Sequence, residues 1–266
     1  MGQKQLTMID AGAEQIYILR DRLTGREPPR ERAAKRRASS EATKAKNICS
    51  SKQKLELYLA VNFPTPKSAL VLSMGFDEQH YRRIKKHRRP SKQRETVRYY
   101  VNEFRKFLRE ARKKAGLPAP RVFCAIEILT SDSNRWHVHC VLDATGEDLP
   151  MVRSCWRFGD NIEARPLRVD REKNHETLAG YLCKETRELQ DHNSRPGTHV
   201  WSASRNVRKP TVTTVTVPGD YRLPLPKGAD VVIDERRDNE FSSYRYTKLR
   251  LGPEAFPKPP RAKRHE

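Results

Sequence analysis

The sequence has no long apolar run and no amphipathic segment with an uninterrupted basic face. The first absence argues against a membrane-spanning helix, and the second against a helix that lies on an anionic membrane surface. The first fifteen residues also lack the basic start and apolar core of a secretory signal. We therefore expect a cytoplasmic protein with no membrane partner.

Cysteine pairs are lacking as well. The five cysteines are odd in number and none forms a Cys-x-x-Cys pair, which argues against a disulfide framework and against a zinc knot. We expect reduced thiols that serve mainly as small core residues; they are Cys49, Cys124, Cys140, Cys155 and Cys183.

Acidic residues are outnumbered by basic ones, 33 Asp and Glu against 54 Lys and Arg, which gives a formal net charge of +21. Such an excess favours a polyanionic partner, most commonly nucleic acid. Hydrophobic residues make up 36% of the chain, which is enough to form a core in part of the chain but not throughout it.

The two ends of the chain are rich in charge. Residues 1–55 are interpreted as a basic N-terminal arm, mobile or partly helical, because the stretch from about Arg20 to Lys54 has few large apolar residues. The arm would bind DNA phosphates, with Lys35, Arg36 and Arg37 among the contacts, or would simply improve solubility. Residues 219–266 are expected to be a C-terminal extension that ends in a disordered basic tail.

Residues 56–218 have the patterning of a folded domain. An apolar run at 68–76 predicts a buried strand, and apolar residues at three- and four-residue steps predict a helix from the N-cap Ser91 to the stop at Gly116. Two strands, 121–129 and 135–143, follow around a polar turn. Weaker signals predict a strand at 161–169, a helix at 174–189, and strands at 198–204 and 210–218. The sequence thus predicts an α+β fold in which helices flank an antiparallel sheet.

Alternation along the paired strands places His137 and His139 on one face and can place Glu127 beside them. The opposite face is wholly apolar and can pack on the long helix. One carboxylate and two imidazoles suit a divalent cation such as Mn²⁺ or Mg²⁺, with zinc as an alternative. A buried glutamate also needs a cation or a hydrogen-bond partner. Without a metal, the two histidines would be ordinary half-exposed residues.

A second group of candidate residues lies in the sequence AGYLCKE. Tyr181 and Lys184 are three residues apart on a predicted helix and therefore lie on the same side of it. Tyrosine is a poor nucleophile at its usual pKa near 10, but a nearby ammonium and a metal-polarised phosphate would activate it. Gly180 is costly inside a helix and could mark the close approach of a ligand. The alternative is a packed tyrosine beside a solvated lysine.

The ordered set of LVLSMGF, Glu127, WHVH, CWRFGDNIEARPL, YLCK and WSASRNVRKP resembles the HUH endonucleases, and most closely the rolling-circle replication initiators of plasmids and bacteriophages. The resemblance covers about residues 68–210. It implies a five-stranded RRM or ferredoxin-like core, metal ligands at Glu127, His137 and His139, and a catalytic Tyr181. Such enzymes nick single-stranded or hairpin origin DNA, form a 5′-phosphotyrosyl link and free a 3′-OH primer.

The resemblance also predicts partners. The positions four residues from Tyr181 are Thr177 and Glu185, so this is a single-tyrosine protein, and a transient second subunit or an activated water would complete a round. No GxxxxGK[ST] run is present, which implies a host helicase and polymerase in a bacterial cytoplasm. A relaxase or single-tyrosine transposase would share the chemistry. The alternative from another class is a non-catalytic DNA-binding protein.

Three basic residues after the tyrosine helix, and three tryptophans, are further candidates for DNA contact. The basic residues would contact the DNA backbone or lie in a solvated loop, and they are Arg205, Arg208 and Lys209. The tryptophans could stack on bases. However, they lie in strand-like runs, and we expect them in the core: Trp136, Trp156 and Trp201.

Overall fold

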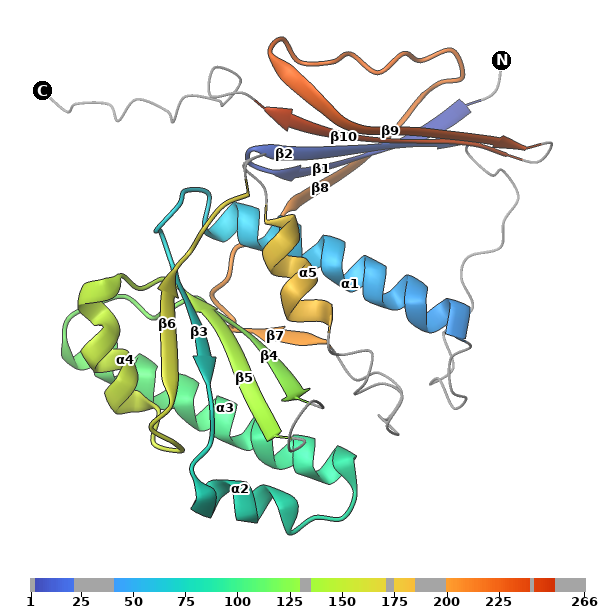
Figure 1. Ribbon diagram of the computed structural model, residues 1–266. Helices are drawn as coiled ribbons and strands as arrows, with labels where there is room; N and C mark the ends of the chain where they lie inside the picture. The colour runs from blue at the N-terminus through green and yellow to red at the C-terminus, as the bar shows by residue number, and fades with distance from the viewer. Residues whose placement is uncertain are drawn as a thin grey trace, which may run out of the picture. The chain divides into compact units, whose positions relative to one another are not determined.

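The computed structural model describes residues 3–21, 41–129, 135–170, 175–184, 200–239 and 242–251. The fold is α+β, as the sequence predicts, and it contains two five-stranded antiparallel sheets (Figure 1). The chain divides into two compact units. We call residues 32–208 the central unit, and residues 1–31 together with 209–266 the terminal unit. No helix in the described ranges combines the length and apolar character needed to cross a membrane.

The sheet of the central unit has the strand order β6-β3-β5-β4-β7, and all neighbouring strands are antiparallel. Its strands fall where the alternating and apolar patterns predict them. They are β3 (Leu70–Met74), β4 (Val122–Leu129), β5 (Arg135–Leu142), β6 (Ile162–Pro166) and β7 (Trp201–Ala203).

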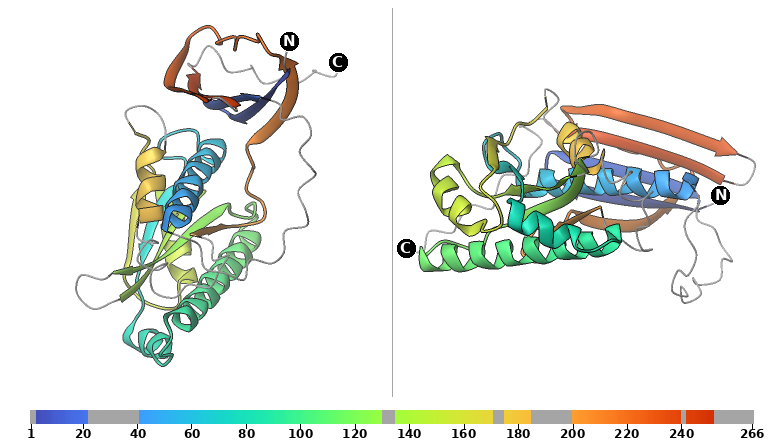
Figure 2. Two further views of the ribbon diagram at one scale, coloured as in Figure 1. Left: turned by 90° about the vertical axis from the view of Figure 1, so that its right-hand side faces the viewer. Right: turned by 60° about the horizontal axis from the view of Figure 1, so that its bottom comes forward.

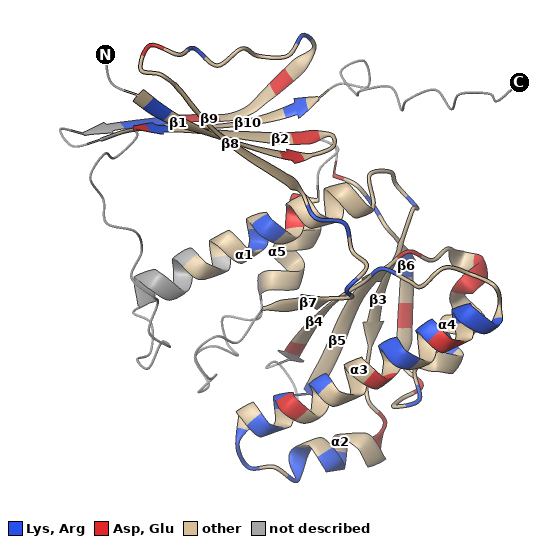
Figure 3. Ribbon diagram, turned by 180° about the vertical axis from the view of Figure 1, so that it is seen from behind, with Lys and Arg blue, Asp and Glu red and all other residues tan. Residues whose placement is uncertain are grey.

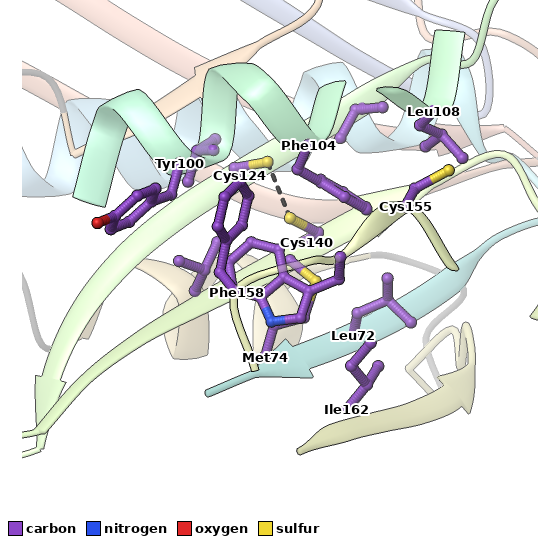
Figure 4. Close-up of a cluster of buried hydrophobic side chains, with 14 of the residues drawn as sticks. Leu72, Met74, Tyr100, Phe104, Leu108, Cys124, Cys140, Cys155, Phe158 and Ile162 are labelled. Carbon is purple, nitrogen blue, oxygen red and sulfur yellow. Dashed lines mark hydrogen bonds between the residues drawn. The ribbon is translucent and has the colours of Figure 1, made fainter. Parts of the chain in front are cut away.

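One face of this sheet packs on α3 (Pro90–Lys114), with α2 (Glu78–Lys85), the short 3-10 helix η1 (Gly146–Asp148) and α4 (Leu149–Cys155) completing that side. The apolar residues of β4 and β5 contact Phe104 and Leu108 of α3, as predicted, and the thiols of Cys124 and Cys140 lie 2.8 Å apart across the two strands (Figure 4). Helix α3 begins one residue before the predicted N-cap Ser91, because Pro90 occupies its first turn. Gly116 ends it with φ +70°, as expected of a C-terminal stop.

The opposite face is covered by α1 (Glu41–Asn62) and α5 (Glu176–Lys184), so the sheet lies between two layers of helices (Figures 1 and 2). Phe123 of β4 and Val141 of β5 are buried beneath these two helices. Because both residues belong to one half of their strands, the other half of this face remains for polar side chains.

The predicted roles of the tryptophans and cysteines largely hold. Trp136 and Trp156 are buried, and Trp201 is partly buried against Tyr58 and Phe123. Four of the five cysteines are buried in the central unit, but Cys49 is exposed on α1, so the expectation of a core role is wrong for that residue.

The terminal unit was not expected from the sequence. It consists of β1 (Gln3–Ala11), β2 (Glu14–Asp21), β8 (Thr211–Pro218), β9 (Ala229–Asn239) and β10 (Ser242–Leu251). The strand order is β8-β1-β2-β10-β9, which joins the first and last parts of the chain in one sheet. Its small core includes Leu6, Leu19 and Val217. At the β1–β2 turn Gly12 has φ +79° and donates its N–H to Asp10.

The observed helices and strands differ from the predicted domain boundaries. Residues 1–55, interpreted as a basic arm, contain a β-hairpin and the first two thirds of α1, and the proposed boundary at residue 56 falls inside that helix. Strand β8, assigned to the domain 56–218, pairs with β1 and so belongs to the terminal unit. Part of the extension 219–266 forms β9 and β10. Lys35, Arg36 and Arg37, and the predicted tail beyond 251, lie outside the described residues.

His175, just before α5, is a buried histidine whose neutral form is favoured by its surroundings. Its Nε2 lies 3.0 Å from the carbonyl oxygen of Phe63, while its Nδ1 is buried without a hydrogen-bond partner among the described residues. Burial lowers the pKa of His175 from its usual 6.5, because the charged imidazolium is poorly solvated there. The unfolded chain therefore takes up this proton at a higher pH than the folded chain does.

This difference predicts that the free energy of unfolding falls as the pH is lowered through about 6.5, by at most about 1.4 kcal/mol per pH unit from this residue. His175→Gln, whose amide can still donate to Phe63, should flatten that dependence. Urea unfolding at pH 7, 6 and 5 would measure it. Equal pH slopes in the wild type and the variant would contradict the assignment.

Candidate metal-binding and catalytic site

The register of β4 and β5 brings the three predicted metal ligands to one face of the sheet. Glu127 lies directly opposite His137, and Ala125 opposite His139. Residues that oppose each other in an antiparallel pair share a face, as do residues two apart on one strand. The register therefore places Glu127, His137 and His139 on the same face of the sheet, as their predicted grouping requires.

Glu127 and His139 form a buried pair at the centre of this group. Each is about 5% exposed, and Oε2 of Glu127 contacts Nε2 of His139. A carboxylate buried without a partner would be costly, and the imidazole supplies that partner. The same two atoms are those that a divalent cation would use.

His137 has an unused nitrogen beside this pair. Its Nδ1 is buried and has no hydrogen-bond partner among the described residues, and its Nε2 lies near Gly75 and Asn161, 3.8 Å from where a Cβ on that glycine would lie. The pKa of His137 is lowered from its usual 6.5, mainly by burial, while the Arg135 backbone and the charge of Glu127 act in the opposite direction. A neutral imidazole with a free lone pair is the form that binds metals.

Helix α5 places Tyr181 against His139. The ring of Tyr181 meets that of His139 edge-on, with 5.1 Å between the ring centroids. Its exposed fraction is 49%, so a large molecule can reach the side chain. Its pKa is raised above 10.0, first by partial burial and then by the negative charge of Glu127, with Arg165 acting in the opposite direction. The phenol therefore keeps its proton near neutral pH unless positive charge is added.

The other two residues singled out in the tyrosine motif, Gly180 and Lys184, also lie on α5. Lys184 is the last residue of α5, and its side chain lies outside what the structure describes. The sequence suggested ligand approach as a reason for Gly180, but the neighbour is another helix: Cε of Lys52 on α1 lies 3.5 Å from where a Cβ on Gly180 would be. The ammonium of Lys52 pairs with Glu176 of α5 at 2.9 Å. A Cβ on Gly180 would make only ordinary van der Waals contact with the end of a flexible side chain, so the packing of α1 on α5 does not require glycine at this position.

Strand β6 contributes two residues that the sequence analysis missed. Glu163 pairs with Ser73, and Ser73 pairs with His139, so Glu163 lies in the same row of the sheet as His139. Glu163 raises the pKa of Tyr181 and Arg165 lowers it. Their alternation on β6 was visible in the sequence, but the order of strands that brings β6 beside β3 was not.

Gly159, from the Trp-x-x-Gly segment of the resemblance, allows two loops to meet beside the site. A Cβ on Gly159 would lie 2.5 Å from the backbone oxygen of Gly75 and 2.8 Å from the nitrogen of Asp77. Trp156 donates its indole N–H to that same oxygen of Gly75, at 2.9 Å. Because every close neighbour is backbone, no side chain can be accommodated by a simple rotamer change.

We therefore expect Gly159→Ala to destabilise the protein by about 2 kcal/mol or more, as overpacking typically does, and to lower Tm by about 4–8 °C. Gly146→Ala is the matched control, since a Cβ there has no neighbour within 4 Å. Thermal unfolding of both variants tests this, and equal Tm values would show that the contact is not tight.

Of the three basic residues predicted to contact DNA, Arg205 and Arg208 lie away from this site, and Lys209 belongs to the terminal unit. Arg205, Arg208 and Lys209 are exposed. The backbone before them is bonded to the start of β4, from Ser204 N to Val122 O, and Glu127 is five residues further along that strand, roughly 17 Å away. A DNA strand would have to span that distance to contact both.

The donor set fits a divalent cation, although the described side chains are not arranged as a metal cluster. Among the residues that the structure describes, no three His, Cys, Asp or Glu side chains form a group that could hold a metal as they stand. One carboxylate and two imidazoles, of which that of His137 has an unused Nδ1, are nevertheless the donors that such an ion requires. A search of family models, curated proteins and solved structures found no match for this chain.

Proposed function

We propose that this protein is a metal-dependent, single-tyrosine DNA nicking and joining enzyme of the HUH type that initiates rolling-circle replication. The observation that supports this best is the contact between Tyr181 and His139, which itself contacts Glu127. A nucleophile, two imidazoles and a carboxylate from three separate segments of the chain are thus adjacent. The alternative of a relaxase or a single-tyrosine transposase would use the same residues.

The reaction is a transfer of a phosphodiester to tyrosine. The phenolic oxygen of Tyr181 gives up its proton and attacks the phosphorus, the bond from phosphorus to the 3′ oxygen breaks, and that oxygen takes up one proton, so that no net proton is gained or lost. The products are a 5′-phosphotyrosyl link and a free 3′-OH that a host polymerase can extend. The reverse reaction rejoins a strand without ATP, because the phosphotyrosine conserves the bond energy.

A divalent cation bound by Glu127, His137 and His139 would supply positive charge that polarises the scissile phosphate and offsets the field of Glu127 on Tyr181. The protein's own residues have separate tasks. His139 fixes the ring of Tyr181 through the edge contact, and Glu127 holds His139 in place. Arg165 favours the phenolate because it lowers the pKa of Tyr181.

The test is to incubate the full chain with a random pool of single-stranded oligonucleotides, some able to form hairpins, and Mn²⁺. We expect a covalent protein–DNA adduct on a denaturing gel, and none when EDTA replaces the metal. DNA binding without any adduct, across both linear and hairpin pools, would favour the non-catalytic DNA-binding protein instead.

A further inference from the structure

The positive charge of the chain is concentrated in the central unit. This unit contains 37 Lys and Arg and 20 Asp and Glu, whereas the terminal unit contains 17 and 13. The net charges are therefore +17 and +4, so most of the excess belongs to the unit with the candidate site. A polyanionic partner should be attracted there first.

Within the central unit, charge is densest where α2 meets α3. The residues from Gln79 to Arg94 contain no acidic side chain. Figure 3 shows Lys and Arg along α2, the connection and the start of α3. Seven exposed basic residues define what we call the basic corner: Arg82, Arg83, Lys85, Lys86, Arg88, Arg89 and Lys92.

Some basic residues of this corner form ion pairs within the protein, and others form none with the described residues. Arg82 pairs with Glu78, and Lys92 with Glu95, on the helix surface at 2.8 and 2.7 Å. Lys86, Arg88 and Arg89 make no ion pair with any described residue. Three unpaired cations within four residues repel each other, so an anion that binds them relieves that repulsion as well as gaining contacts.

The basic corner lies at the end of the sheet that holds the candidate site. The guanidinium of Arg135, two residues before His137, lies over the ring of Tyr81 on α2, 6.0 Å from its centroid. The indole of Trp136 donates to Gln93 on α3, at 3.0 Å. Figure 1 shows α2 at the end of the sheet where β3 finishes and β5 begins. A strand bound at the basic corner can thus continue directly to the site.

An aromatic side chain lies next to the charges. Tyr99 on α3 is 58% exposed, an unusual position for so large an apolar ring. It is seven residues after Lys92, so both lie on one face of the helix. Basic side chains beside an exposed aromatic ring are the combination by which proteins bind single strands, with phosphates on the cations and a base on the ring.

We propose that the basic corner binds the phosphates of a single-stranded DNA segment that leads to the Tyr181 site, and that Tyr99 stacks on one of its bases. The direction of the DNA strand, toward Tyr181, rests on the proposed function. The binding itself depends only on the charge, the exposed ring and their place at this end of the sheet.

The experiment compares two triple variants of the full chain, both in a Tyr181→Phe background so that no DNA is cleaved. The first, Lys86→Gln, Arg88→Gln and Arg89→Gln, removes three charges from the basic corner. The second is the matched control, Lys106→Gln, Arg109→Gln and Lys113→Gln, which removes three exposed charges along α3, about 30 Å from the start of that helix beside the basic corner. Fluorescence anisotropy with a labelled random single strand is measured over a range of KCl concentrations.

We expect the first variant to bind at least about tenfold more weakly at 0.1 M salt, with a salt slope smaller by about 2, and the control to change far less. Tyr99→Leu should weaken binding by about fivefold or more without changing the slope. Equal effects of the two triple variants would overturn the proposal, since only net charge would then matter. If the first triple variant kept its DNA affinity but no longer pelleted with phosphatidylserine vesicles, the basic corner would instead be assigned to membrane binding. Failure of the proposed function would be recognised separately, by the lack of a covalent adduct in the wild type.

Discussion

Tyr181→Phe is expected to reduce covalent adduct formation by at least about a thousandfold, because no other group replaces a deleted nucleophile efficiently. DNA affinity should stay within about threefold, since the change removes one exposed hydroxyl and no charge. The ring contact with His139 survives in phenylalanine, so the site should keep its arrangement. The rate of adduct formation and the anisotropy of bound DNA measure the two quantities independently.

The matched control for this variant is Tyr99→Phe. Tyr99 is exposed like Tyr181 but lies on α3, and phenylalanine keeps its ring for stacking. This control should form the adduct at close to the wild-type rate. If both variants kept full activity, Tyr181 would not be the nucleophile; if both lost it equally, the assay would be reporting on DNA binding instead.

Mn²⁺ is expected to raise the Tm of the wild type by about 5–10 °C at a hundredfold excess over its Kd, since ligand binding to the folded state alone adds about 2.7 kcal/mol. His137→Ala should still fold and should lose most of this shift. The reason is that His137 is only partly buried and offers a free Nδ1, so removing it leaves no buried charge unpaired.

Glu127→Ala and His139→Ala should behave differently from His137→Ala. Glu127 and His139 form a buried contact, so removing either residue leaves the other buried without its partner, at a cost of about 3–5 kcal/mol. Both variants should therefore lose stability even without metal.

His87→Ala is the control for the metal experiment, since His87 is exposed between α2 and α3. It should keep the full Mn²⁺ shift, and EDTA should reverse the shift in every protein that shows it. A Tm that does not respond to Mn²⁺ in the wild type, or an equal response in His137→Ala, would remove the case for a cation at these residues.

The strands that form the site could be predicted because their pattern is local. Alternation along β4 and β5 separates the apolar face from Glu127, His137 and His139, and the short connection between the strands limits the registers available. The two strands match the predicted ones to within one residue at each end. Tyr181 could likewise be placed on a helix, but its contact with His139 depends on how α5 packs across the sheet.

The terminal unit was missed because its sheet joins segments that lie about 200 residues apart. The hairpin of β1 and β2 carries apolar residues, but its sheet is completed only by strands from the other end of the chain, and β8 resembles a further strand of the central sheet. The basic corner was overlooked for a different reason. Its charge was counted in the whole-chain total, and the end of the sheet that it occupies is shown by two contacts in the structure, Arg135 with Tyr81 on α2 and Trp136 with Gln93 on α3.

The measurement that tests the central claim most directly is mass spectrometry of the adduct after nuclease and trypsin digestion. Cleavage at Lys173 and Lys184 releases the peptide NHETLAGYLCK, residues 174–184, which contains Tyr181 as its only tyrosine. We predict that this peptide carries the residual nucleotide through a phosphodiester to the phenol. A nucleotide found on any other peptide would contradict the assignment of Tyr181, and with it the site built around Glu127, His137 and His139.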